Sequence, residues 1–342
     1  MASKTLARAK SAKEDEFYTQ LSDISNELKN YKPFFKDKVV FCNCDDPYES
    51  NFFKYFALNF NALGLKKLIA TCYNGSPVSG NELLLDFGTT VDDPKKVAYK
   101  VEITEVTDAN GDGAINLADI QYLMQNDKNV ISILQGNGDF RSPECVELLK
   151  EADIVVTNPP FSLFREYIAQ LMEYDKKFLI LGNQNAVTYK EIFTLIKDNK
   201  VWLGYKNGNM CFTVPAYYEP RPTRFWIDET GQKWRSLGNI CWLTNLETRK
   251  RHEDLVLYRT YNEQDYPKYD NYDAINVDKV TEIPRDYEGV MGVPITFLDK
   301  YNPEQFEIVG AMTTTKVDEY NYGYPYINGN KLYARILVRR KK

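Results

Sequence analysis

Four consecutive residues of this chain suit one kind of chemistry. Asn158-Pro159-Pro160-Phe161 directly follows residues 153–157, an apolar run that is typical of a buried strand. An Asn side-chain oxygen and a nearby backbone carbonyl can each accept an N–H from an exocyclic amino group, which frees the nitrogen lone pair for attack. Proline keeps its carbonyl, lacks an N–H and stiffens the turn. The tetrad therefore predicts alkylation of an amino group, with the Phe161 ring stacked on a base.

The histidine and cysteine content excludes several other chemistries. His252 is the only histidine of the 342 residues, which argues against a Ser-His-Asp hydrolase, a zincin or a multi-histidine iron site. The six cysteines form no C-x-x-C pair, so neither a zinc ribbon nor a thioredoxin motif is expected. The chain also lacks a Pro-Cys dipeptide, which carries the nucleophile in cytosine C5 methylation.

Alternating strands and helices must position the tetrad. Short apolar runs predict strands, and apolar side chains at helical spacing predict helices. We expect strands at 38–43, 66–72, 130–134, 153–157, 177–182, 201–204, 211–214 and 240–244. We expect helices at 13–31, 49–63, 143–150, 162–174 and 189–198. This alternation is typical of a doubly wound α/β sheet, which binds ligands at the carboxyl ends of its strands.

Length and charge set further limits. A chain of 342 residues makes about two domains. No apolar stretch is long enough to span a bilayer, and the N-terminus lacks the apolar part of a secretory signal, so a cytoplasmic location is expected. The net charge is −5, yet basic residues without acids gather in residues 1–13, 249–252 and 331–342. Three such clusters on an acidic protein predict a polyanionic partner.

Several segments together resemble the EcoRI-like family of adenine-specific DNA methyltransferases. Residues 153–161 look like the catalytic motif of amino-group DNA methyltransferases, in the form typical of adenine N6 enzymes. Residues 15–19 resemble the N-terminal cofactor motif, and residues 41–47 lie where the first strand meets S-adenosylmethionine. Residues 138–140 resemble a motif in which an Asp binds the cofactor's adenine amino group while a Phe packs on its ring.

The resemblance implies a fold, an activity and a set of site residues. The fold is Rossmann-like, with a mixed, mostly parallel seven-stranded sheet and a C-terminal appendage. The activity is methyl transfer from S-adenosylmethionine to N6 of an adenine flipped out of duplex DNA. The tetrad is catalytic. The cofactor-binding residues are Tyr18, Thr19, Asn43, Asp45, Asp46, Cys72, Asp139 and Phe140. The usual Gly-x-Gly after the first strand is replaced by Cys-Asn-Cys-Asp-Asp, so side chains must do more of the binding.

Residues 216–237 and the region after 248 are the expected DNA-reading segments. The resemblance places Phe212 against the target base. Guanidinium groups bind phosphates and guanine edges, which makes the arginines of these segments the candidate contacts. They are Arg221, Arg224, Arg235, Arg249 and Arg251.

Residues 108–119 carry a second, separate pattern. Oxygen-bearing side chains at loop positions 1, 3, 5 and 12, with glycine at position 6, fit a calcium loop of the EF-hand or dockerin type. The expected ligands are Asp108, Asn110, Asp112 and Asp119. The twelfth residue is Asp rather than Glu, and no second loop is present to pair with it. A structural calcium ion and a metal-free acidic turn both stay open.

The expected organisation is a catalytic domain over 1–248, interrupted by an insertion at 74–128, and a DNA target-recognition region over 249–342. Double-stranded DNA is the expected partner of a monomeric enzyme, and the existence of a cognate restriction endonuclease stays open. Two alternatives also stay open. One keeps the reaction and moves it to RNA adenine or protein glutamine. The other is a calcium-dependent binding module built around residues 108–119.

Overall fold

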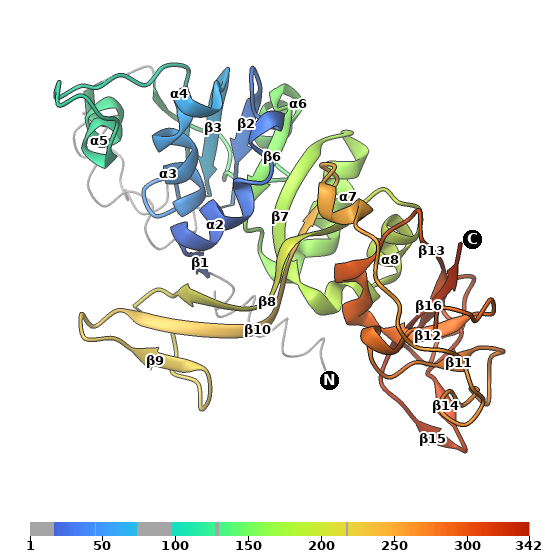
Figure 1. The fold of residues 1–342 in the computed structure, drawn as a ribbon. Helices are drawn as coiled ribbons and strands as arrows, with labels where there is room; N and C mark the ends of the chain where they lie inside the picture. Colours follow the sequence, from blue (N-terminus) through green and yellow to red (C-terminus); the bar gives the residue numbers. More distant parts are fainter. Residues whose placement is uncertain (1–16, 45, 74–97, 127–129, 217, 342) are drawn as a thin grey trace. The chain divides into compact units, whose positions relative to one another are not determined.

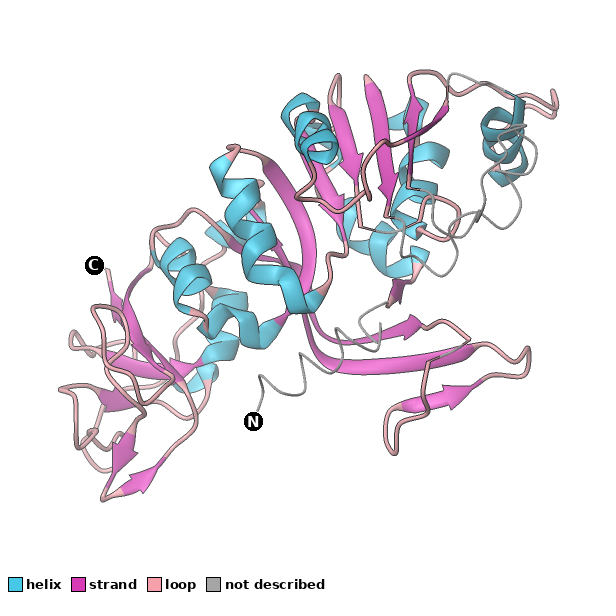
Figure 2. Ribbon diagram, turned by 180° about the vertical axis from the view of Figure 1, so that it is seen from behind, coloured by secondary structure: helices cyan, strands magenta, loops and turns pink. Residues whose placement is uncertain are grey.

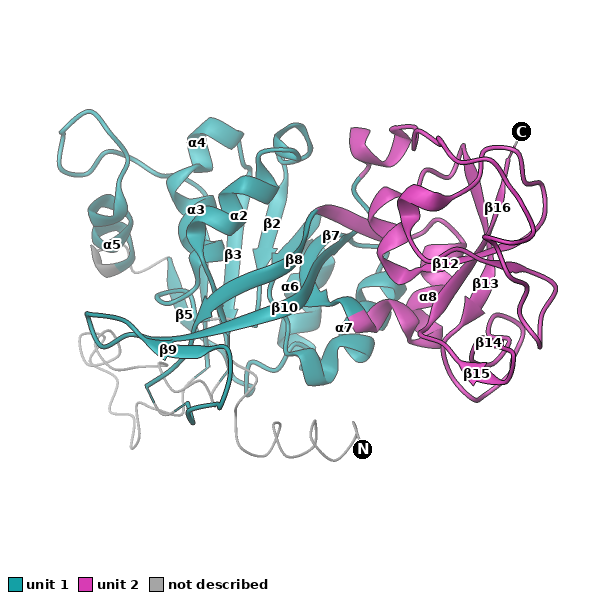
Figure 3. Cartoon of the chain, turned by 60° about the horizontal axis from the view of Figure 1, so that its bottom comes forward, with its two compact units in different colours: residues 1–184, 206–246 teal, residues 185–205, 247–342 magenta. Residues whose placement is uncertain are grey.

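The computed structural model of the chain describes residues 17–44, 46–73, 98–126, 130–216 and 218–341. The chain divides into two compact units, coloured teal and magenta in Figure 3. Unit 1 comprises residues 1–184 and 206–246, and unit 2 comprises 185–205 and 247–342. None of the described helices is long and apolar enough to cross a membrane.

Unit 1 is built on a ten-stranded sheet in the order β1-β8-β10-β7-β6-β2-β3-β4-β5, with β9 paired to β10. The neighbours β7, β6, β2 and β3 run parallel. β10 pairs antiparallel with β7, β4 pairs antiparallel with β3, and β5 pairs antiparallel with β4. The strands are β1 Tyr18–Thr19, β2 Val39–Cys42, β3 Lys67–Cys72, β4 Tyr99–Ile103, β5 Ile131–Ile133, β6 Ile154–Thr157, β7 Lys177–Asn183, β8 Trp202–Thr213, β9 Phe225–Ile227 and β10 Lys233–Thr244.

Helices lie on both faces of the parallel strands (Figures 1 and 2), which is why every residue of β2 and β6 is buried. α3 begins after Ser50, whose hydroxyl accepts a hydrogen bond from the Phe53 amide. α4 ends at Gly64, which adopts a left-handed φ of 62°. The helices of unit 1 are α2 Leu21–Leu28, α3 Asn51–Leu58, α4 Phe60–Leu63, α5 Leu117–Asn126, α6 Pro143–Glu151 and α7 Phe164–Glu173.

The predicted fold class is confirmed, although the sheet is larger than the seven strands expected. β4 lies in a stretch that we assigned to the inserted segment, and β1 and β9 add to the antiparallel side. The first helix is shorter than predicted because Tyr18 and Thr19 pair with Thr213 and Phe212 of β8. Residues 216–237, which we expect to read DNA, contain β9 and the start of β10, so β8, β10 and β9 form a long antiparallel ribbon (Figure 1).

Unit 2 contains a four-stranded sheet in the order β11-β12-β16-β13 and a separate hairpin of β14 and β15. Asn328 and Gly329 form the tight turn of that hairpin with φ values of 50° and 73°, and the Asp270 carboxylate accepts both of their amides. The elements are α8 Lys190–Lys197, β11 Ile275–Asn276, β12 Met291–Pro294, β13 Phe306–Met312, β14 Tyr326–Ile327, β15 Asn330–Lys331 and β16 Arg335–Arg340.

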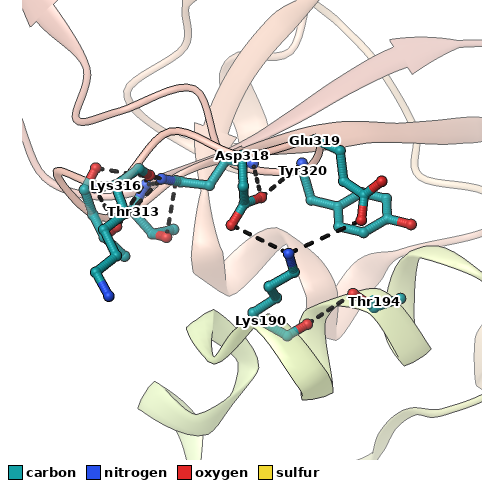
Figure 4. Close-up of polar contacts among 9 residues, drawn as sticks. Lys190, Thr194, Thr313, Lys316, Asp318, Glu319 and Tyr320 are labelled. Carbon is teal, nitrogen blue, oxygen red and sulfur yellow. Dashed lines mark hydrogen bonds and ion pairs between the residues drawn. The ribbon is translucent and has the colours of Figure 1, made fainter.

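Contacts of α8 explain why residues 185–205 belong to unit 2. The Lys190 ammonium lies 3.7 Å from the Asp318 carboxylate and 4.0 Å from that of Glu319 (Figure 4). About two helix turns further on, the Lys197 ammonium lies 5.4 Å from the centre of the Tyr320 ring. The chain therefore enters unit 2 for α8, returns to unit 1 at residue 206, and leaves it again after residue 246.

Candidate active site

The tetrad Asn158-Pro159-Pro160-Phe161 lies at the edge of the sheet where the parallel strands end. Asn43 follows β2, Cys72 ends β3 and Asn158 follows β6, and these three strands are parallel neighbours. After β2 the chain crosses to β3 on one side, and after β6 it crosses to β7 on the other. The site is thus the topological switch point of the sheet, where open α/β sheets bind their ligands.

The Asn158 amide is held in one orientation. Its Nδ2 donates a hydrogen bond of 2.6 Å to the backbone carbonyl of Phe17. Its Oδ1 is buried and has no hydrogen-bond partner in the described part of the chain. Only 7% of the residue is exposed. A buried acceptor without a donor is costly, so this oxygen is suited to receive an N–H from a bound molecule.

The rest of the tetrad lies beside aromatic rings. Pro159 is buried, whereas Pro160 and Phe161 are half-buried. The Phe161 ring stacks on Phe17, with centroids 5.9 Å apart and planes 24° apart. The Phe17 ring also meets the edge of Phe212 at 5.7 Å. Phe161 therefore has one supporting ring behind it and part of its surface still accessible.

Asn43 links the first strand to the helix that follows the tetrad. The Tyr167 hydroxyl of α7 donates to Asn43 Oδ1, and the Thr157 hydroxyl of β6 donates to the Asn43 carbonyl. The Phe140 ring meets the Tyr167 ring edge-on at 5.0 Å. Complete burial raises the pKa of the Tyr167 hydroxyl well above its usual value, so it remains a donor. Two predicted cofactor residues, Asn43 and Phe140, therefore both contact Tyr167.

Asp46 and Cys72 also come together, but their polar groups already have partners. The Tyr99 hydroxyl of β4 lies 2.9 Å from both carboxylate oxygens of Asp46, and the Tyr48 amide donates to the same carboxylate. Burial raises the Asp46 pKa, while hydrogen bonds from Cys72, Tyr48 and Tyr99 act against this shift. The buried Asp46 carboxylate thus holds the loop after β2 through hydrogen bonds within the protein. Asp45 lies outside the described residues.

Asp139 reaches the same edge because Gly138 passes very close to β3. A Cβ at Gly138 would lie 2.3 Å from the Cys72 carbonyl oxygen, and the residue has a φ of +73°. The Asp139 carboxylate forms an ion pair of 2.7 Å with Arg141, whose guanidinium also pairs with Glu166 and lies 5.0 Å from the Phe140 ring centre. The Asp139 carboxylate is therefore already engaged by Arg141.

Tyr18 and Thr19 lie in β1, next to the tetrad. Thr19 is 3% exposed, and its hydroxyl has no partner among the described residues. The Tyr48 hydroxyl is likewise buried without a partner in that part of the chain. The Thr19 carbonyl accepts the Asn51 side chain at 2.8 Å, which anchors β1 to the start of α3. Two orphaned hydroxyls next to the strand ends are suited to a polar ligand.

Phe212 is not placed as the resemblance implied. It is completely buried in β8, opposite Thr19 in the strand register, with its ring against Phe17. A ring with no exposed surface cannot lie on a target base in this conformation, so Phe212 supports Phe17 instead. No local pattern predicts this burial, because the partner strand β1 is only two residues long.

The ribbon of β8, β10 and β9 carries three of the candidate arginines. Arg221 and Arg224 are exposed, and the Arg221 guanidinium lies 5.8 Å from the Tyr218 ring centre. Arg235 is half-buried and donates to the carbonyls of Thr223 and Arg224, so it braces the ribbon. Sequence reasoning missed the stacked pair of Trp226 and Trp234, whose centroids are 6.0 Å apart; Trp226 is 40% exposed.

The two candidate arginines of unit 2 differ from each other. Arg249 is exposed. The Arg251 side chain is only 9% exposed, with its guanidinium 3.9 Å from the Trp202 ring centre and bonded to Glu247 and Asn199. The expectation that Arg251 contacts DNA is therefore withdrawn, because its charge and its donors are used inside the unit.

The loop at 108–119 is ordered by hydrogen bonds to its own backbone. Asp108 accepts the amides of Gly111, Asp112 and Gly113, and Asp119 accepts those of Ala109, Asn110 and Asn116. Within the described ranges, no three or more His, Cys, Asp and Glu residues are grouped so as to hold a metal ion. Of the expected ligands, Asp108, Asn110 and Asp112 lie in the turn that precedes α5, and Asp119 lies in the first turn of that helix. The calcium hypothesis gains no support from this arrangement.

The parallel core, the switch point and the tetrad after β6 together define the class of methyltransferases that act on amino groups. A family model described as "Adenine-specific methyltransferase EcoRI" matches residues 5–341. The chain belongs to this family, and it is an EcoRI-like adenine methyltransferase that acts on DNA.

Curated relatives agree with this assignment. The chain is 52% identical to the type II methyltransferase M.EcoRI of Escherichia coli, over 99% of this chain and 97% of that protein. It is 38% identical to the type II methyltransferase M.MgeORF184P of Mycoplasma genitalium and 39% identical to M.MpnI of Mycoplasma pneumoniae, over 98% of each chain. No solved structure gives a significant match.

Proposed function

We propose that this enzyme transfers a methyl group from S-adenosylmethionine to N6 of an adenine flipped out of duplex DNA, and that it modifies the site of a cognate restriction endonuclease. The observation that carries the proposal is the buried, unpartnered Oδ1 of Asn158 beside the stacked ring of Phe161. The type II relatives support the biological role.

Asn158 prepares the amino group for attack. The adenine nitrogen is a weak nucleophile because its lone pair is delocalised into the ring. Its N–H bonds point to Asn158 Oδ1 and to a backbone carbonyl of the proline pair, which draws the nitrogen toward tetrahedral geometry. Oδ1 is shielded from solvent, so the neighbouring groups must move apart for the base to enter. Once the base is bound, water is absent and the hydrogen bond to Oδ1 is stronger than it would be in water.

The residues near β1, β2 and β3 fit a polar cofactor. The unpartnered hydroxyls of Thr19 and Tyr48 can bind its polar groups, and Phe140 and Asn43 border the same edge. S-adenosylmethionine supplies an activated methyl group when bound. The protein's own contribution is to hold the base in line with that methyl and to exclude water.

The exposed arginines supply phosphate contacts. Arg221 and Arg224 project from the β8–β10–β9 ribbon of unit 1, and Arg249 lies on unit 2 within the proposed target-recognition region, residues 249–342. Exposed Trp226 on the ribbon adds an apolar surface that could contact an unstacked base step. The ribbon and unit 2 are thus each proposed to contribute DNA contacts of their own.

Nucleoside analysis of the product tests the proposal. The protein is incubated with methyl-labelled S-adenosylmethionine and duplex DNA, and the DNA is digested to nucleosides. Label in N6-methyl-2′-deoxyadenosine is expected. Label only in cytosine, or only when ribosomal RNA or a glutamine-bearing protein replaces DNA, would contradict it.

A further inference from the structure

Phe17 makes two separate contacts with the catalytic loop. Its backbone carbonyl accepts the Asn158 Nδ2 at 2.6 Å, and its ring stacks on Phe161. The residue is 9% exposed and lies 141 positions from Asn158 in the sequence. The first and the last residue of the tetrad are thus held by the same distant residue.

The position of Phe17 is itself fixed by unit 1. The two residues after it form β1, which pairs with Thr213 and Phe212 at the end of β8. Its ring meets Phe212 edge-on at 5.7 Å and Tyr218 at 6.1 Å. The carbonyl is therefore presented from an ordered strand end, and the ring is wedged between the loop and the ribbon.

The carbonyl decides which atom of the Asn158 amide is available to a substrate. A carbonyl oxygen only accepts hydrogen bonds, so it selects the orientation in which the NH2 group is turned toward it. The opposite orientation would set two acceptors against each other and would offer the substrate amino group a donor. Only the observed orientation leaves Oδ1 free to accept an N–H.

We propose that Phe17 is a positioning residue for methyl transfer: its carbonyl sets the Asn158 amide so that Oδ1 faces the target amino group, and its ring backs the Phe161 ring. This inference rests on the proposed function, because it assigns Phe17 a role only through Asn158 and Phe161. It predicts that perturbing Phe17 slows the methyl-transfer step more than it weakens cofactor binding.

The carbonyl contact is tested by the pH profile of Asn158→Asp. A carboxyl group at position 158 can donate to the Phe17 carbonyl only when it is protonated, and burial raises its pKa. The ratio of variant to wild-type single-turnover rates should be highest at low pH and should fall about tenfold per pH unit above that pKa. A ratio that stays constant from about pH 5.5 to 8.5 would overturn the carbonyl's role.

The ring contact is tested by Phe17→Leu, which keeps an apolar side chain but removes the flat stacking surface. The methyl-transfer rate should fall between about ten- and a hundredfold, with the KM for S-adenosylmethionine changed less than about twofold. The matched control is Phe35→Leu. Phe35 is also a buried ring of unit 1, but it packs edge-on against Phe56 rather than against Phe161. The control should lose similar stability and keep its rate.

The outcomes separate the two proposals. If the wild-type protein does not methylate adenine, or Asn158→Ala methylates normally, the proposed function fails. If the wild type is active, Asn158→Ala is inactive, and Phe17→Leu loses no more rate than Phe35→Leu, only the positioning role fails. Folding of each variant is checked by its denaturation midpoint before rates are compared.

Discussion

The close approach of Gly138 to β3 gives a quantitative prediction for Gly138→Ala. The residue has a φ of +73°, and an added Cβ would lie 2.3 Å from the Cys72 carbonyl and 2.9 Å from the Ala98 Cβ. Left-handed backbone costs an L-residue roughly 1–2 kcal/mol. Crowding of this kind adds roughly 1–3 kcal/mol. We expect a total loss of about 2–5 kcal/mol in the free energy of unfolding.

The loop can relieve the clash only by moving Asp139 and Phe140 away from Cys72. Because 1.4 kcal/mol of misfit corresponds to a factor of ten in affinity, S-adenosylmethionine should bind Gly138→Ala at least about tenfold more weakly. Urea denaturation and calorimetric titration measure the two quantities. Gly111→Ala is the matched control, since Gly111 has the same φ of +73° and no heavy atom within 4 Å of the added Cβ.

Gly111→Ala should lose only the cost of left-handed backbone, roughly 1–2 kcal/mol in the free energy of unfolding, and should bind the cofactor as wild type does. The reasoning would be refuted if Gly138→Ala bound S-adenosylmethionine as tightly as wild type. It would also be refuted if both variants lost the same free energy of unfolding, since crowding against β3 would then add no cost.

Three further predictions concern charged side chains. Burial raises the Asp46 pKa above its unfolded value of 3.8, so the folded state loses stability as the pH rises above 3.8. Asp46→Asn should therefore unfold at a higher temperature than wild type at neutral pH, and the difference should shrink toward pH 4. Equal melting curves at all pH values would contradict this. Arg224→Ala should weaken DNA binding at every sequence and lower the salt slope by about 1. Arg251→Ala should instead destabilise unit 2 by roughly 1.5–3 kcal/mol while leaving that slope unchanged; a reversed pattern between the two arginines would show that their placement is misassigned.

Local sequence pattern was enough to predict the elements that carry the tetrad. The runs that became β2, β3, β6 and β7 are continuous and apolar, and each is confirmed to within about two residues. Such runs are buried on both faces, so the pattern depends little on what each strand pairs with. The resemblance to the EcoRI-like family is confirmed by the family model and the relatives.

Elements that depend on a distant partner could not be predicted. Tyr18 and Thr19 have helical neighbours in the sequence, but they form a strand because β8 offers them a free edge. Tyr99 lies in a stretch without clear periodicity, and yet its hydroxyl holds Asp46. A hydrogen bond between residues 53 positions apart leaves no local trace in composition or spacing.

The same limit applies to the candidate site. Asn158 was predicted from its motif, but the carbonyl of Phe17 that orients it has no side-chain signature. Phe212 was assigned to the target base because it follows the expected order of motifs, and order does not reveal burial. Arg251 was expected to bind DNA because it lies in a basic run, whereas Trp202 and Glu247 hold its guanidinium.

The most direct test of the central claim is the single-turnover methylation rate of Asn158→Ala on duplex DNA at saturating S-adenosylmethionine. Loss of one acceptor that acts in the transition state should lower the rate by about a hundred- to a thousandfold, with cofactor binding unchanged. A variant that methylates adenine at the wild-type rate would show that the unpartnered Oδ1 does not activate the amino group.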